Sequence, residues 1–297
     1  MPNVLLTPKQ IASASLAALE QQTVLAATTW RDAEADFAGK RGDTVTVRTG
    51  TVVGPARRYN RAENKPIVID DVVEHAVDVK LSDYLYKGVA VTDEQLSLHI
   101  ADFTTRVAVP QAKSVATEVE VMVAAQMNAL TGSLTFKPDG SDVHRQILAA
   151  RTRLNKAGVP REDRFLAVSA EIEAVILDDP NKRLINADSD TWTAALREAV
   201  IGRLYGFNVV PSVYIADGSA VAYHRTGFPL VTRAMEVPSG ASFGESMTYN
   251  DIALRLIRDY DPGYQQDRSV VSTLAGTTTT LDEGVLKRSL RLTTAAA

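Results

Sequence analysis

The pattern with the clearest chemical potential is the pentapeptide GASFG at residues 240–244, which matches the G-x-S-x-G nucleophile elbow of serine hydrolases. In that motif a strand leads through a sharp turn into a helix, and the acid and then the histidine follow the serine. The last histidine of this chain is His224, which precedes Ser242. Because the triad cannot be completed in that order, we interpret residues 240–244 as a flexible glycine–serine loop.

The other polar residues give little support for metal or acid–base chemistry. His75, His99 and His144 do not pair at a ligand spacing on one element, and no cysteine can replace them. We interpret the carboxylate pairs at 70–71 and 178–179 as a solvated strand edge and a helix end. No P-loop and no G-x-G-x-x-G pattern is present. We therefore expect no enzyme activity, no cofactor and no metal.

The composition indicates an ordinary soluble globular protein. Of the 297 residues, 45% are hydrophobic and 23% are charged, and the formal net charge is -4 at pH 7. This charge, with basic residues interleaved with acidic ones, predicts no global attraction to nucleic acid or to an anionic membrane. No apolar run has the length of a membrane span, and the first twenty residues lack a signal-peptide pattern. The absence of cysteine excludes disulfides and fits a cytoplasmic protein.

The stretch from residue 92 to residue 130 is expected to form two helices that organise the chain. Thr92 and Gln95 make a capping-box pattern that starts a short helix. Pro110 either starts or kinks the longer second helix, and Gly132 ends it. Up to ~28 residues at ~1.5 Å each would form a rod of roughly 42 Å. Glu120 falls largely off the apolar stripe, whose members are Val107, Ala112, Val115, Val119, Met122, Met127 and Leu130.

A long β-hairpin is expected before these helices. Residues 44–53 alternate apolar and polar positions, and residues 67–81 form the returning strand. The returning strand has one apolar face, made of Ile67, Ile69, Val73, Val77, Val79 and Leu81. The segment between the strands is basic and polar. Because a two-stranded ribbon alone in water is marginally stable, it needs a supporting surface on its own domain or on a neighbouring chain.

An N-terminal helix is expected to start at Thr7, as its N-cap, and Pro8, as its first helical residue. This helix packs either on its own domain or on another partner. Helices are expected at 141–157, capped by Ser141, at 170–177, capped by Ser169, and from 189 or 190 to 204. The first of these buries Val143, Ile147, Leu148 and Leu154. Strands are expected at 164–168, 207–210, 220–223, 230–237, 252–257 and 269–274. The tail is expected to be partly frayed at residues 277–280 and at the final alanines.

This order of elements resembles the major capsid (coat) proteins of tailed double-stranded DNA bacteriophages, which have the Hong Kong 97-type fold. The N-terminal helix and the hairpin, with its return strand at 72–84 (VVEHAVDVKLSDY), resemble that family's arm and extended E-loop. The long helix ending near Leu130 resembles the spine helix of its peripheral domain. Residues 195–212 (ALREAVIGRLYGFNVVPS) are similar to the helix–Gly–strand segment of its axial domain.

The resemblance implies an α+β chain in five parts. These are an N-terminal arm (1–41), an E-loop (42–82), a peripheral domain with the spine helix (83–134), a mixed α/β axial domain (135–249), and return strands of the peripheral domain with a C-terminal tail (250–297). It implies a structural protein that self-assembles into hexamers and pentamers of an icosahedral head. The E-loop would lie on a neighbouring subunit, with contacts through Arg57, Arg58, Tyr59 and Arg61.

The implied partners are other copies of the chain, a separate scaffolding protein, a portal, a decoration protein, and packaged double-stranded DNA bound without sequence preference. The implied location is the virion capsid, assembled in the cytoplasm of a bacterial host. Two alternatives stay open. One is an encapsulin-type bacterial nanocompartment shell, which packages a cargo enzyme instead of DNA. The other is a two-domain α/β serine hydrolase built around Ser242, which the order of the triad residues disfavours.

Overall fold

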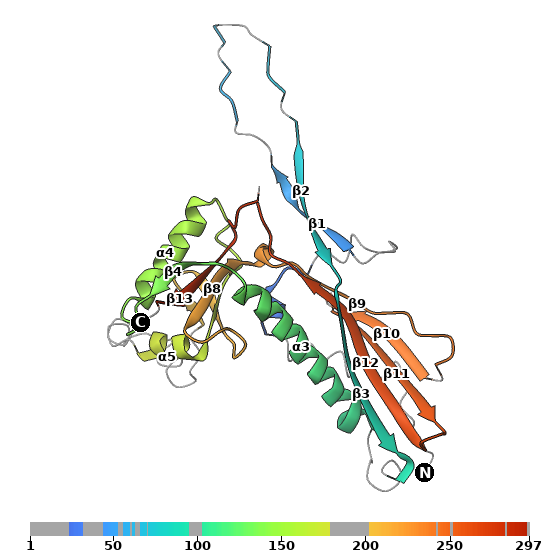
Figure 1. Ribbon diagram of the computed structural model, residues 1–297. Coiled ribbons are helices and arrows are strands. Elements are labelled where there is room, and N and C mark those ends of the chain that lie inside the picture. Colours follow the sequence, from blue (N-terminus) through green and yellow to red (C-terminus); the bar gives the residue numbers. More distant parts are fainter. Residues whose placement is uncertain are drawn as a thin grey trace.

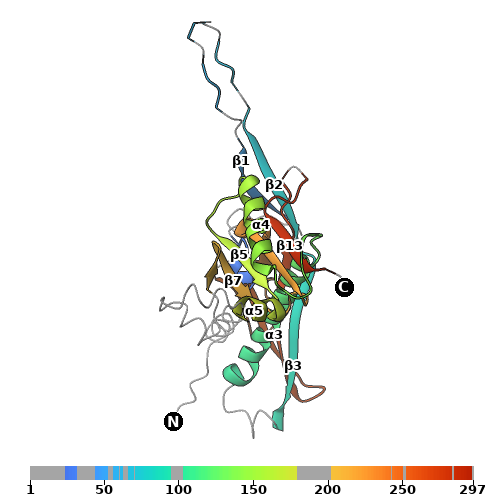
Figure 2. The ribbon, with the colours of Figure 1, turned by 90° about the vertical axis from the view of Figure 1, so that its left-hand side faces the viewer.

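The computed structural model describes residues 24–31, 44–52, 56–59, 61–62, 66–69, 71–94, 103–178, 202–241, 243–249, 252–282 and 284–295. Within these ranges the chain forms a two-stranded ribbon, a long antiparallel sheet and a six-stranded mixed sheet (Figure 1). The ribbon projects away from the two sheets, and the perpendicular view shows that it continues the long axis of the molecule (Figure 2).

The ribbon leads directly into the long sheet. Strands β1 (Thr44–Val52) and β2 (Val73–Lys80) pair antiparallel, with Thr44 opposite Lys80. After two residues the chain continues into β3 (Asp83–Thr92), an edge strand of the long sheet. The sheet order is β10-β11-β12-β3, and β9 pairs with the end of β12. The other strands are β9 (Leu230–Arg233), β10 (Phe243–Tyr249), β11 (Ile252–Asp261) and β12 (Gln266–Thr277).

Helix α3 (Val109–Asn128) lies along the long sheet and extends to the mixed sheet (Figure 1). A π-helical turn (Thr104–Ala108) precedes it, and Pro110 lies in its first turn, where a missing amide donor leaves no hydrogen bond unmade. The first half of α3 packs Ala112 and Val115 against the long sheet. Its second half packs Val123 and Met127 in a core shared with Leu25, Tyr223 and Phe228. The helix therefore joins the two sheets.

The mixed sheet has the order β4-β13-β8-β5-β7-β6, with parallel pairing of β13 with β4 and of β5 with β7. Its strands are β4 (Gly132–Phe136), β5 (Arg164–Val168), β6 (Arg203–Leu204), β7 (Phe207–Pro211), β8 (Ser219–His224) and β13 (Ser289–Thr294). Helices α4 (Val143–Lys156) and α5 (Ala170–Asp178) pack against this sheet through Ile147, Leu154 and Ile176.

Many predicted elements are confirmed. The hairpin, the long helix with its apolar stripe, the strand over 164–168 and the helix after Ser169 are all present. So are the strands near 207–210, 220–223, 230–237, 252–257 and 269–274, although most differ in length from the prediction. The N-terminal helix lies outside the described residues, as does most of the helix predicted from 189 or 190.

Several predictions for the helices are wrong. The long helix ends at Asn128, and Gly132 begins β4. Glu120 is buried and not off the stripe, because it binds backbone donors of another segment. The start of the first helix is not among these errors, because residues 93–94 are helical and directly follow Thr92, the last residue of β3; the partner proposed for its cap, Gln95, lies outside the described residues. The N-cap of α4 is Asp142 and not Ser141.

Further corrections concern side chains near the helix ends. Leu148 of α4 is 41% exposed, so it does not belong to the buried face of that helix. Among the described residues the Ser169 hydroxyl has no hydrogen-bond partner, so its side chain does not cap α5. The predicted helix to residue 204 is wrong at its end, because Arg203 and Leu204 pair with Asn208 and Phe207 as β6.

The remaining corrections concern strands. Residues 67–69 are not part of a strand, and the returning strand begins at Val73. Residues 243–244, interpreted as a loop, belong to β10, which lies in the long sheet although it falls within 135–249. The tail is not frayed at 277–280, since Thr280 is fully buried and its hydroxyl donates to the Thr226 carbonyl. Strand β13, within 250–297, lies in the mixed sheet.

Candidate functional site

The base of the ribbon is held by a small apolar cluster. Alternation along β1 and β2 places one side chain of every two on the same face, as expected for a pleated strand. The buried members are Val45, Val47, Val79, Leu81 and Val231, with Trp30 packed against them. The opposite face is exposed and polar, and there the Thr46 hydroxyl donates to Asp78 Oδ1 at 2.7 Å. The ribbon is therefore supported by its own chain only near its base.

Close packing at this base depends on a glycine in β12. A Cβ placed on Gly276 would collide with the carbonyl oxygen of Lys80, the last residue of β2. The backbone of the ribbon therefore passes over the end of the long sheet at a distance that only glycine permits. This contact fixes the direction in which the ribbon leaves the molecule.

The basic segment beyond β1 is solvent exposed. Residues 56–59 and 61–62 lie in the projecting part of the molecule beyond β1 (Figure 1), and Arg57, Arg58, Tyr59 and Arg61, the residues singled out from the sequence, are all exposed. Tyr59 is 51% exposed, which is high for a large aromatic side chain. These residues thus present three guanidinium groups and a phenol at the projecting end of the molecule.

An apolar run on the returning limb is the feature that the sequence interpretation missed. Ile67, Val68 and Ile69 are 79%, 62% and 90% exposed, and Val72 is 63% exposed. The sequence predicted that Ile67 and Ile69 would share a covered strand face. In the structure consecutive side chains are all exposed, so neither face is covered. An exposed apolar cluster of this kind marks an interaction surface.

The segment before the ribbon is fastened to α3 by a buried carboxylate. Glu120 Oε2 accepts a hydrogen bond from the Leu25 N–H at 2.8 Å, and Oε1 accepts one from the Ala26 N–H at 3.0 Å. These donors open a short 3₁₀ helix (Ala26–Thr28), whose first N–H groups have no partner within the helix. Burial raises the pKa of Glu120, and the backbone hydrogen bonds oppose that shift without cancelling it.

A second contact holds the same segment against β8. The hydroxyl groups of Thr28 and Tyr223 are hydrogen-bonded at 2.5 Å, and Tyr223 is fully buried. Burial is the main cause of the raised pKa of the Tyr223 phenol, which therefore stays protonated. Trp30 follows, and its backbone bonds to Phe228 and Leu230. Residues 25–30 are thereby bound to strands of both sheets.

The face of the long sheet opposite α3 carries exposed aromatic side chains. Tyr84 and Tyr86 of β3 stack with ring centroids 5.5 Å apart and are 46% and 65% exposed. Arg255 of β11 donates to the Tyr84 hydroxyl at 3.2 Å. Among the described residues β3 pairs with β12 alone, so within this part of the chain the face adjoins an unpaired strand edge. A second apolar, aromatic surface is thus available for contact with another molecule.

The serine-hydrolase arrangement receives no support from the described residues. Ser242 itself lies outside them, but the turn at residues 239–240 leads into strand β10 and not into a helix. The nucleophile elbow requires a helix at that point. His224 is engaged with Thr226, whose hydroxyl lies 2.8 Å from Nδ1. Burial lowers the pKa of His224, with the nearby Arg288 charge adding to the effect.

The described residues also offer no candidate metal site and no candidate membrane span. No group of three or more histidine and carboxylate side chains there could hold a metal ion. His144 lies against the ring of Tyr205, with centroids 5.8 Å apart. The side chains of His75 and His99 lie outside the described set. No helix in the described part of the chain is long and apolar enough to cross a membrane.

Comparison with known proteins identifies the fold. No family model matches the sequence, and no curated protein matches it. The structure is similar to a solved chain of Mycobacterium phage Che8, with a TM-score of 0.61 and 22% identity, covering 91% of this chain and 90% of that one. It is also similar to the capsid of cyanophage P-SCSP1u, with a TM-score of 0.57 and 13% identity over 86% and 85% of the two chains.

A third similar structure is the virus-like particle from Pyrococcus furiosus, with a TM-score of 0.55 and 13% identity over 96% of this chain and 98% of that one. At these identities the similarity establishes the fold. The chain has the α+β Hong Kong 97-type capsid fold, as the resemblance predicted. The projecting ribbon corresponds to the extended hairpin expected from that fold, and α3 to its long helix.

Proposed function

We propose that this chain is the major capsid protein of a tailed double-stranded DNA bacteriophage, and that it self-assembles into the hexamers and pentamers of an icosahedral head. The observation that carries this proposal is the ribbon. Its base is buried in its own chain, whereas its far end exposes four large aliphatic side chains. Burying each of these side chains would contribute about 1.5–3 kcal/mol. A neighbouring copy is the partner that a closed shell supplies to every subunit.

The symmetry of such an assembly fits the shape of the molecule. A projecting element that docks on a different surface of the next copy makes a heterologous interface, and such interfaces close into rings. The face bearing Tyr84 and Tyr86 and the unpaired edge of β3 are candidate acceptor surfaces. Interfaces of permanent assemblies bury about 2,000–5,000 Å² in total, so the ribbon would be one of several contacts.

The domain roles follow from the two sheets. In this proposal β3, α3 and β9–β12 form the peripheral domain, and β4–β8, β13, α4 and α5 form the axial domain. This division differs from the sequence-based boundaries where β9, β10 and β13 cross between the sheets, and at β4, which begins before residue 135. Residues 1–41 would be the N-terminal arm. Arg57, Arg58, Tyr59 and Arg61 would contact a neighbouring subunit.

The partners in this proposal are copies of the chain, a scaffolding protein, a portal, a decoration protein and packaged DNA. The role is structural and not enzymatic, and the location is the virion capsid after assembly in the host cytoplasm. DNA contact would be weak and independent of sequence, in keeping with the net charge of -4.

The test is the assembly state of the purified full-length protein, by sedimentation velocity and negative-stain electron microscopy. Capsomers or closed shells are expected. A dilute monomer with a well-ordered ribbon would contradict the proposal.

The similarity to the Pyrococcus furiosus particle supports a second candidate, a nanocompartment shell. Shells purified from the native source that hold a cargo protein and no DNA would favour that candidate. Stoichiometric labelling of Ser242 by a fluorophosphonate would instead indicate a hydrolase.

A further inference from the structure

Three arginine side chains gather where α4 ends and β5 begins. Arg164, the first residue of β5, is buried, and its guanidinium donates to Asn155 Oδ1 at 2.8 Å and to the Pro160 carbonyl at 2.7 Å. Arg151 precedes Asn155 by four residues, so the two side chains are neighbours on the surface of α4. Arg161 directly follows Pro160. Arg151 and Arg161 therefore belong to the two segments that Arg164 holds together.

This arginine cluster (Arg151, Arg161 and Arg164) has no carboxylate partner in the described part of the chain. The hydrogen bonds of Arg164 all end on neutral oxygen atoms. Burial lowers the pKa of Arg164, and the charges of Arg151 and Arg161 lower it further. The carboxylates of the same turn, Glu162 and Asp163, make no ion pair with described residues. The positive charge of the cluster is therefore left without a counter-charge from this part of the chain.

A structural role accounts for Arg164 alone, because its hydrogen bonds close the turn after α4. The guanidinium of Arg151 lies over the turn between β6 and β7, where a Cβ on Gly206 would be 3.6 Å from its central carbon. Arg161 is exposed. Two further positive charges beside a buried guanidinium disfavour its charged form, so a turn with no other task would be better served by neutral side chains. The arrangement instead suits an anion.

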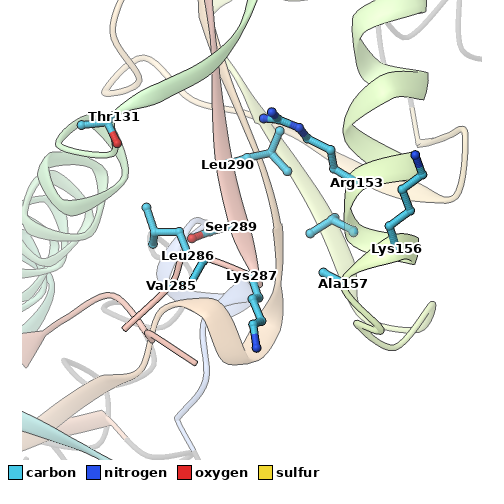
Figure 3. A pocket seen from close by; sticks show the side chains of 10 residues that line it. Thr131, Arg153, Lys156, Ala157, Val285, Leu286, Lys287, Ser289 and Leu290 are labelled. Atoms are coloured by element: carbon cyan, nitrogen blue, oxygen red, sulfur yellow. The ribbon is translucent and has the colours of Figure 1, made fainter. Parts of the chain in front are cut away.

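The cluster is separate from a pocket of about 550 Å³ between α4 and the loop that leads into β13 (Figure 3). Arg153 and Lys156 line that pocket, whereas Arg151 and Arg161 do not. Arg153 follows Arg151 by two positions, and residues at this spacing point to different sides of a helix. The anion would therefore lie on the side of α4 that faces away from the pocket.

We propose that Arg151 and Arg161 bind a phosphate group beside the buried charge of Arg164. The planar guanidinium presents paired N–H donors that match two phosphate oxygens. A free phosphate supplies nearly two negative charges on one group, and a nucleic acid supplies one on each of several neighbouring groups. A carboxylate offers one charge and two oxygens, so it would leave more of the cluster unbalanced. The proposal does not rest on the proposed function, because the ribbon takes no part in it.

The binding test uses the full-length chain and two sources of phosphate. Sodium phosphate is titrated by isothermal calorimetry, and a labelled DNA duplex of mixed sequence is followed by fluorescence anisotropy. Binding of phosphate alone would support a site for a small phosphate ligand. Binding of the duplex, with an affinity that falls as salt is added, would support contact with a nucleic acid backbone. Binding of neither, or equally tight binding of a polyglutamate peptide, would overturn the proposal.

Variants then locate the binding site. Arg151→Gln combined with Arg161→Gln is expected to weaken binding of the phosphate source by at least about tenfold. For the duplex, the slope of log affinity against log salt should also fall by about 1.8, since each phosphate contact contributes about 0.9. Arg164 is left unchanged because it closes the turn, and thermal unfolding checks that the variant is folded.

The matched control is Arg145→Gln combined with Lys113→Gln, which removes the same charge from two exposed positions outside the cluster. It is expected to change binding by less than about threefold. Equal losses in the two double variants would mean that net charge and not the cluster attracts the anion, and the proposal would fail.

Discussion

Glu120 of helix α3 and Leu25 of the preceding segment are joined by a buried hydrogen bond of 2.8 Å across 95 positions of sequence. The other carboxylate oxygen accepts from the next residue, Ala26. A single side chain thereby caps the short helix at 26–28 and fastens it to the longest helix of the fold. The base of the ribbon packs against Trp30, which follows in the same segment. The position of the ribbon therefore depends on this buried carboxylate.

Replacing Glu120 tests this dependence. Glu120→Ala leaves the Leu25 and Ala26 N–H groups without acceptors, and each should cost about 1–3 kcal/mol of unfolding free energy if water does not replace the side chain. Chemical denaturation of the wild type and the variant measures the loss. Glu118→Ala is the matched control, because Glu118 is an exposed residue of the same helix, and it should change stability by less than about 0.5 kcal/mol. Equal losses in the two variants would contradict this role.

The raised pKa of Glu120 predicts a pH dependence of stability with an unusual sign for a carboxylate. Its folded-state pKa lies above the ordinary value of 4.5 because the side chain is buried. The folded chain thus holds the proton more firmly than the unfolded chain. The resulting stabilisation is complete below pH 4.5 and is lost as the pH rises through the folded-state pKa. Urea unfolding should show the stability of the wild type relative to Glu120→Gln falling as the pH rises. A wild-type stability that instead increases relative to Glu120→Gln as the pH rises would contradict this prediction.

The close approach of Gly276 to Lys80 predicts that the ribbon base tolerates no side chain at this position. Gly276→Ala should force the ribbon away from the long sheet and reduce stability by about 1–3 kcal/mol, the usual effect of overpacking. Hydrogen exchange should also become faster in β1 and β2. Gly240→Ala is the control, since a Cβ there meets no atom within 4 Å. Unchanged exchange in the ribbon of Gly276→Ala would show that the contact does not fix it.

Arg164 is predicted to be essential to the turn that follows α4. Its guanidinium donates to the carbonyls of Val159 and Pro160 at 2.6 and 2.7 Å and to the Asn155 side chain at 2.8 Å. Arg164→Ala should lower the free energy of unfolding by about 1–3 kcal/mol, because the buried Val159 carbonyl loses its donor. Thermal unfolding measures this effect. The neighbouring exposed Arg161→Ala should be nearly neutral, and a similar loss there would argue against the assignment.

Much of the fold could be predicted because its periodicity is local. The alternation of Val45, Val47 and Val79 specified a ribbon with one buried face, and the spacing from Val107 to Leu130 specified the long helix. Strand β5 was predicted with its observed limits because a short apolar run lies between turn residues. These signals require no knowledge of distant residues.

The rest depends on distant partners. Strand β13 has a polar sequence, and it forms only because β4 and β8 lie on either side of it. Strand β10 begins inside the GASFG stretch, at Phe243, and a Cβ on Gly244 would collide with the Val237 side chain. In the sequence Glu120 resembles a solvated residue, because its two hydrogen-bond donors, the N–H groups of Leu25 and Ala26, belong to a segment far away along the chain. Such pairings cannot be inferred from local spacing.

The contact of the basic segment with a neighbouring subunit stays a prediction. The sequence located this segment, Arg57, Arg58, Tyr59 and Arg61, whose side chains are exposed in the structure. It did not indicate that residues 67–69 are all exposed, since the same residues fit a strand pattern with one covered face. Whether such a face is covered depends on the neighbouring surface, which the sequence does not specify.

The guanidinium groups of the ribbon end predict a salt-dependent assembly rate. Combined Arg58→Glu and Arg61→Glu should slow association and weaken its dependence on ionic strength, because exposed interfacial charges act mainly on encounter. Light scattering during assembly at several salt concentrations measures both effects. Arg161→Glu combined with Arg203→Glu, at two exposed positions outside the ribbon, is the control for the change in net charge. An assembly rate that stays at the wild-type value in the tip variant would contradict the proposed contact.

The central claim is that the apolar run at residues 67–69 becomes buried against a neighbouring copy. Sedimentation velocity of Ile67→Asp/Ile69→Asp beside the wild type tests it most directly, with thermal unfolding as the check on folding. We predict capsomers or shells for the wild type and a folded, unassembled subunit for the variant, with the free energy of unfolding changed by less than about 0.5 kcal/mol. Val213→Asp, at a highly exposed valine outside the ribbon, is the control. Assembly of the double variant to the same extent as the wild type would contradict the account.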